Sequence, residues 1–166
     1  MTFADIPAGS SVFVDADTFV YHFTPHPVFR AACEQLMDRF VRKDVVGFTS
    51  ADVLRDVAHR LMTMEAIIQF GWPVAGIAQR LRRHHDEIPK LGRFRQAIDE
   101  IPRLGVQVVP TTQPLVSAAA ALSQSHELLS GDALIVSHMQ GNGLAQIASQ
   151  DRDFDRVPGL TRYAPA

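Results

Sequence analysis

The sequence contains one cysteine, Cys33, and this excludes both an internal disulfide framework and a cysteine-rich zinc site. No apolar run approaches the roughly eighteen residues that a helix needs to span a bilayer. The first residues, MTFADIPAGSS, show neither the basic start nor the apolar stretch of a secretory signal peptide. We therefore expect a soluble, cytoplasmic protein with no membrane segment.

An excess of either charge is also absent, since the formal net charge of the 166 residues is −2. This balance argues against a protein that coats nucleic acid through a strongly basic face, but it does not exclude a nuclease. Internal repeats and low-complexity linkers are absent as well. We expect a single domain over residues 1–166, with residues 1–10 as an N-terminal extension.

Short β-rich apolar runs alternate with longer segments that have helical periodicity. The expected strands are 11–15, 45–50, 106–110 and 144–149, with a further edge strand at 160–165. The expected helices are 28–43, 51–70, 74–85, 91–101, 114–129 and 132–140, and Ser50 is placed to cap the second of them. This alternation predicts an α/β fold, a three-layer α/β/α sandwich with a central, mostly parallel sheet of four to five strands.

Acidic residues follow the predicted strands or lie on the helices after them. Asp15 and Asp17 come after the first strand, and Asp56 lies on the helix after the second strand. The others are Asp132, which opens a helix, and Asp151 and Asp153, which follow the fourth strand. Ligands of such sheets bind beyond the carboxyl ends of the strands, so we expect these acids to converge at one edge.

Clustered carboxylates repel one another, and a cation is needed to keep them ionised at neutral pH. Hard divalent ions such as Mg²⁺ and Mn²⁺ prefer oxygen ligands, and they assist the hydrolysis of phosphodiesters. Each acid also has a purely structural interpretation. Asp15 can cap a turn, Asp132 can cap its helix, and Asp56 can pair with Arg60 one turn later. Asp151 and Asp153 can bind amides of their own loop.

Four segments in order resemble the PIN domain, the fold of VapC-type toxin ribonucleases: VFVDADTFVY, FTSADVLRDVAHRLM, GDALIVSHMQGNG and IASQDRDFDRVPGL. The resemblance covers Val12 to Pro165. It implies cleavage of single-stranded RNA with Mg²⁺ or Mn²⁺ by the toxin of a type II toxin–antitoxin pair, with a VapB-like antitoxin as its partner. Surplus exposed apolar residues on the helices of the first half would support such a partner or a homodimer. The acids that the resemblance implies as catalytic are Asp15, Asp56, Asp132 and Asp151. Those that it implies as metal ligands are Asp15, Asp132, Asp151 and Asp153. It also implies supporting roles for Asp17 and Ser50.

Two residues depart from the family pattern. Asp56 stands where a glutamate is usual, and its side chain is one methylene shorter, so its contact with a metal can run through water. Asp17 stands where an asparagine is usual, and it adds a carboxylate beside Asp15. An alternative function is therefore a PIN-like module that binds RNA or protein and cleaves weakly.

The most basic stretch of the chain lies in its middle. Arg80, Arg82 and Arg83 are candidates to bind the RNA backbone if this stretch overhangs the acids, and a solvated helix face is the alternative. The pattern Asp15-Ala16-Asp17-Thr18 also suggests a haloacid-dehalogenase-type phosphatase. Phe19 stands where that family has threonine, and no lysine follows the middle strands, so we favour the ribonuclease.

Overall fold

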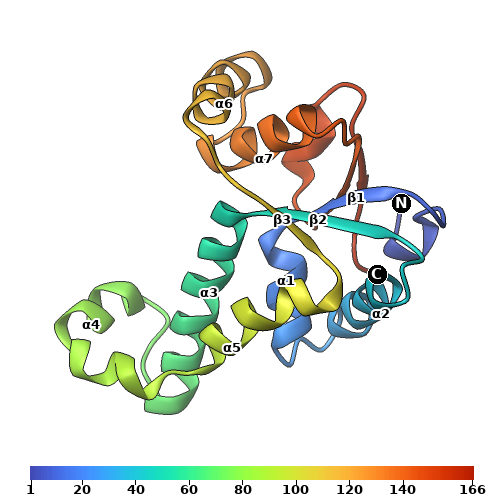
Figure 1. Cartoon of the computed structure of the whole chain (residues 1–166). Helices are drawn as coiled ribbons and strands as arrows, with labels where there is room; N and C mark the ends of the chain where they lie inside the picture. Colours follow the sequence, from blue (N-terminus) through green and yellow to red (C-terminus); the bar gives the residue numbers. More distant parts are fainter.

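Five short strands form one sheet in the computed structural model, which describes residues 1–166 (Figure 1). The strands are β1 (Ser11–Val14), β2 (Val46–Ser50), β3 (Gln107–Val109), β4 (Gln146–Ala148) and β5 (Thr161–Tyr163). Their order is β3-β2-β1-β4-β5, and every neighbouring pair is parallel. The chain continues from β1 to β2 on one side and returns to β4 on the other. The strand order therefore switches at β1, where a ligand crevice is expected.

Helices cover both faces of the sheet (Figure 1). One face carries α1 (Ala16–Phe23), α2 (Arg30–Val41), α3 (Ala51–Phe70) and α5 (Arg93–Glu100), and the other carries α6 (Gln113–His126) and α7 (Ser130–Gly141). This arrangement confirms the predicted three-layer α/β/α sandwich. None of the helices combines the length and the apolar character needed to cross a membrane.

The main core lies on both faces of the central strand. Val12, Phe13 and Val14 of β1 are fully buried, which explains why this strand is a continuous apolar run. Residues 1–10 also pack on this core, because Phe3 and Ile6 are buried. The predicted N-terminal extension is thus attached to the sandwich.

Helix α1 was not among the elements expected from the sequence. It begins directly after β1 because Asp15 occupies the N-cap position and accepts a hydrogen bond from the Ala16 amide. Its eight residues give too short a stretch for clear periodicity. The predicted helix 74–85 is also shorter, as α4 (Ile77–Arg83) passes into the 3₁₀ helix η2 (His85–Lys90), which contains Pro89.

Residues 71–92 form a projection that we call the α4 lobe. It lies at the C-terminal end of α3 and projects away from the sheet (Figure 1). A small apolar cluster of Ala66, Leu81 and Leu91 joins it to α3, separately from the main core.

Candidate metal centre

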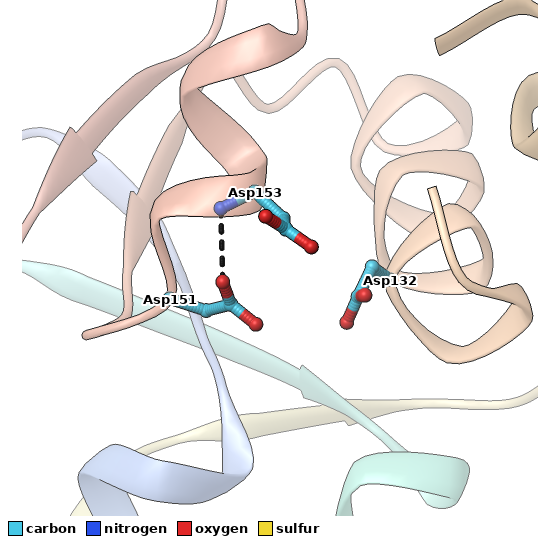
Figure 2. Close-up of side chains that lie close together, drawn as sticks. All are labelled: Asp132, Asp151 and Asp153. Carbon is cyan, nitrogen blue, oxygen red and sulfur yellow. Dashed lines mark hydrogen bonds between the residues drawn. The ribbon is translucent and has the colours of Figure 1, made fainter. Parts of the chain in front are cut away.

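Three carboxylates converge beside the C-terminal ends of β1 and β4. Asp132 comes from the first turn of α7, while Asp151 and Asp153 come from the loop after β4 and the 3₁₀ helix η4 (Arg152–Arg156). One oxygen of each lies within 4.8 Å of the others, and Figure 2 shows Asp132 facing the other two. The predicted convergence of these acids is confirmed for this trio.

The carboxylate of Asp132 has no partner within the chain. Leu129 is the N-cap of α7 and Asp132 is the third residue of the helix, so the interpretation of Asp132 as a helix cap was wrong. Its side chain forms neither a hydrogen bond nor an ion pair, although it is partly buried. Burial, followed by the charges of Asp151 and Asp153, raises the pKa of Asp132 to about 6. The side chain is therefore held among like charges without compensation.

Asp151 and Asp153 each use one oxygen within the chain. Oδ1 of Asp151 accepts a 2.9 Å hydrogen bond from the amide of Asp153, as the dashed line in Figure 2 marks. Oδ1 of Asp153 lies 3.0 Å from a guanidinium nitrogen of Arg156. The local amide contact expected for a loop acid is thus present, and the second oxygen of each carboxylate has no partner in the chain.

Asp15 lies at the C-terminal end of β1 and is tied down through both oxygens. Oδ1 accepts the amide of Ala16 at 2.6 Å, and Oδ2 accepts the hydroxyl of Ser149 at 2.7 Å. Burial and the charge of Asp17 raise the pKa of Asp15 to about 7, and Asp132 adds to this effect. Asp15 therefore caps α1 and also lies within reach of the charges of Asp17 and Asp132.

Asp17 is a buried acid in the first turn of α1. Its Oδ2 accepts a 2.8 Å hydrogen bond from the amide of Gln150, which links α1 to the loop after β4. Burial raises the pKa of Asp17, while that hydrogen bond and the charge of Arg60 act in the opposite direction. The side chain thus supports the loop that carries Asp151.

Ser149 connects the two halves of the site, and its role was not predicted. Its hydroxyl donates to Asp15 and accepts a 3.0 Å hydrogen bond from the amide of Asp151. The side chain is fully buried at the end of β4. A hydroxyl at a strand end, two residues before an acid, is the local signal that points to this position.

Arg162 of β5 anchors the segment after β4 that carries Asp151 and Asp153. Its guanidinium donates to both oxygens of Asp155, at 2.8 and 3.0 Å, and to the carbonyl of Ser149 at 3.2 Å. Its side chain is only 13% exposed. No local pattern in the sequence identifies this residue, because its partners lie on another element.

The donor set of this site fits a hard divalent cation. Asp132, Asp151 and Asp153 offer only carboxylate oxygen, and several of these oxygens have no partner in the chain. Asp15 is not part of this trio, but it lies close enough for the charge of Asp132 to raise its pKa. Oxygen ligands of this type suit Mg²⁺ and Mn²⁺, while a site for a softer metal would contain sulfur or imidazole.

Residues 12–160 match the PIN domain. The chain belongs to the PIN-domain family. A search of curated protein sequences finds no significant match.

Solved structures share the PIN fold of this chain at low sequence identity. VapC20 of Mycobacterium tuberculosis, a sarcin-ricin loop cleaving toxin, has a TM-score of 0.59 and 19% identity, over 87% of this chain and 92% of that one. VapBC2 of Rickettsia felis, bound to a DNA fragment from its promoter, has a TM-score of 0.58 and 13% identity, over 94% and 99%. PAE2754 of Pyrobaculum aerophilum has a TM-score of 0.54 and 12% identity, over 92% and 89%.

Asp56 lies outside the carboxylate trio of this PIN domain. Its carboxylate lies 2.9 Å from a guanidinium nitrogen of Arg55. The pairing with Arg60, expected if Asp56 were only a structural residue, is not formed. About half of its side chain is exposed, at 49%. Ser50 is buried and accepts a 3.3 Å hydrogen bond from the Val53 amide, which confirms the predicted cap of α3.

The basic stretch of the PIN domain does not overhang the acids. Arg80, Arg82 and Arg83 belong to the α4 lobe, at the opposite end of α3 from its N-terminus. Ala51 and Phe70, the two ends of this helix, are separated by about 28 Å at the usual helical rise, and Ala51 is the end that follows β2. Any contact of these arginines with RNA is therefore remote from the acidic site.

Proposed function

We propose that this PIN-domain protein is a Mg²⁺- or Mn²⁺-dependent endoribonuclease that cleaves single-stranded RNA. One observation carries the proposal: the partly buried carboxylate of Asp132 has no partner in the chain and faces Asp151 and Asp153. A structural acid would be paired or fully solvated. A carboxylate kept among like charges is typical of a cation site.

The proposed roles follow from the contacts of each residue. Asp15, Asp132, Asp151 and Asp153 hold the ion, and Ser149 fixes the orientation of Asp15 by its 2.7 Å hydrogen bond. A bound divalent ion supplies the activation of water and the stabilisation of phosphoryl charge that phosphodiester hydrolysis requires. The proposed catalytic acids are Asp15, Asp56, Asp132 and Asp151, with Asp17 and Ser50 in supporting positions.

The proposal extends to a toxin of the cytoplasm that is neutralised by a small antitoxin. Two similar folds support it, VapBC2 of Rickettsia felis and a toxin–antitoxin complex from Klebsiella pneumoniae. A hollow of about 270 Å³ between α1, α3 and α5 is lined by apolar residues that include Phe23, Leu61 and Met64, and by the charged residues Glu65, Arg93 and Glu100. An amphipathic antitoxin segment fits this surface. Co-purification with the co-expressed product of the neighbouring reading frame supports the pairing, and failure of the two co-expressed proteins to co-purify contradicts it.

RNA cleavage by matched variants tests the proposed activity. The wild type is expected to degrade single-stranded RNA with Mn²⁺, and Asp15→Asn and Asp132→Asn are expected to lose this activity while remaining folded. Asp99→Asn, which removes an exposed acid of α5, serves as the control and should retain it. Cleavage that survives Asp132→Asn would contradict the proposal.

A second function is favoured by one observation, the pairing of the short Asp56 side chain with Arg55. If Asp56 does not contribute to the site, the domain binds RNA or protein and cleaves weakly. A folded wild type that binds single-stranded RNA but does not cleave it with either metal would support this second function.

A further inference from the structure

The α4 lobe carries an aromatic cluster around Trp72. The Trp72 ring centroid lies 4.8 Å from that of Phe70 and 5.4 Å from that of His84. The guanidinium carbon of Arg80 lies 5.8 Å from the centroid of the Trp72 ring, in a cation–π arrangement. Aromatic rings and a cation are thus interleaved where the lobe joins the end of α3.

A polar hollow of about 200 Å³ adjoins this cluster, and its lining includes no carboxylate. The lining residues are Ala75, Gly76, Gln79, Arg80, Arg83 and His84. Arg80, Arg82 and Arg83 are exposed and form no ion pair. The guanidinium groups that line the hollow, Arg80 and Arg83, are therefore available to an external anion.

We infer that the α4 lobe is a second RNA-binding site, specific for single strands and separate from the acidic site. Arg80 and Arg83 bind backbone phosphate in the hollow, since guanidinium groups match the geometry of phosphate oxygens. An adjacent base stacks on the cluster of Trp72 and His84, and every base has a face suited to such stacking. A duplex does not fit, because its bases are already stacked on one another. The choice of RNA as the ligand rests on the proposed function.

The position of the lobe sets a length requirement on the RNA. The lobe begins at the C-terminal end of α3, about 28 Å at the usual helical rise from Ala51, where α3 starts at the carboxyl end of β2. Only a strand that spans this distance contacts both sites. The lobe therefore increases the affinity for long substrates and leaves the cleavage of very short ones unchanged.

Trp72 is the only tryptophan of the chain, so its fluorescence reports directly on the lobe. The experiment titrates Asp132→Asn protein in EDTA with a single-stranded oligoribonucleotide, which excludes cleavage and metal binding. We expect saturable quenching that weakens with salt. Arg80→Gln with Arg83→Gln should raise the Kd at least about tenfold. The matched control, Arg42→Gln with Arg103→Gln, removes the same charge from exposed positions outside the lobe and should leave the Kd unchanged.

Three results would overturn the inference. They are unchanged fluorescence with RNA, an equal loss of affinity in the control variant, and equal quenching by a polyglutamate peptide, which would indicate an acidic protein partner. Equal binding of a duplex of the same sequence would overturn the inference as well, because the inference specifies single strands. Because binding is measured without metal, an inactive wild type would refute the proposed nuclease activity without affecting this test.

Discussion

The hydroxyl of Ser149 donates a 2.7 Å hydrogen bond to Oδ2 of Asp15, although 134 positions separate the two residues. The contact exists because β1 and β4 are parallel neighbours and both residues follow the ends of their strands. The same hydroxyl accepts the amide of Asp151. The buried side chain of Ser149 thus fixes the positions of Asp15 and Asp151 relative to each other.

Replacing Ser149 by alanine is expected to weaken Mn²⁺ binding by about tenfold to a hundredfold, the usual effect of losing a group that orients a ligand. Asp15 would lose one of its two hydrogen bonds, and the amide of Asp151 would lose its acceptor. Isothermal titration with Mn²⁺ measures the change. Ser149→Thr retains the hydroxyl and should restore most of the affinity. Equal affinities of the wild type and Ser149→Ala would show that this contact does not position the acids.

Arg162→Lys tests whether the ion pair with Asp155 positions the acidic loop. Lysine keeps the charge but cannot donate to both oxygens of Asp155 and to the Ser149 carbonyl in the same planar arrangement. We expect the Kd for Mn²⁺ to rise by about tenfold. Arg30→Lys changes a surface pair with Glu34 in the same way and should leave the affinity unchanged. A similar Kd for both variants would contradict the positioning role.

The stability of the metal-free protein is expected to fall as pH rises. Burial raises the pKa of Asp15 from 3.8 to about 7 and that of Asp132 to about 6, so the folded state binds these protons more tightly than the unfolded chain does. The protonated forms favour folding, and this contribution is lost between about pH 4 and pH 7. Thermal unfolding in EDTA across this range should show a decreasing Tm.

Mn²⁺ is expected to reverse this loss, because it compensates the carboxylates that become ionised. Near pH 7.5 an ion concentration of about one hundred times Kd should raise Tm by roughly 5–10 °C. Near pH 5 the effect should be small, since protons compete with the ion. Asp15→Asn should flatten the pH dependence in EDTA, while Asp99→Asn should not. A Tm insensitive to Mn²⁺ at both pH values would contradict a metal site.

Asp56→Glu is expected to increase RNA cleavage. The extra methylene extends the carboxylate beyond the short pair that Asp56 forms with Arg55, and it restores the residue usual at this position of the family. The measurement is the initial rate of Mn²⁺-dependent cleavage, compared with that of Asp99→Glu, which makes the same change at an exposed position of α5. A rate unchanged by Asp56→Glu would indicate that this position lies outside the working site.

The layers of the fold could be predicted because the apolar residues of β1 form a continuous run, whereas those of the long helices recur every three or four positions. Val12, Phe13 and Val14 are buried together, and a continuous apolar run of this kind indicates a central parallel strand. Helix α1 was missed because its start depends on a single cap at Asp15, not on a long amphipathic pattern.

The site could be predicted only where residues follow strands or begin helices. Asp132, Asp151 and Asp153 converge for that reason. The ion pair of Arg162 with Asp155 depends on the register between β4 and β5, which no local pattern encodes. The basic stretch is remote from the acids because it follows the far end of the twenty-residue helix α3, whose length was predicted correctly.

The most direct test of a metal centre is the position of Mn²⁺ in crystals grown or soaked with this ion, found from its anomalous scattering. The account predicts a peak among the carboxylates of Asp132, Asp151 and Asp153, next to Asp15, and no peak in crystals of Asp132→Asn. A well-ordered wild-type structure with no peak there, or with Mn²⁺ bound only elsewhere, would contradict it.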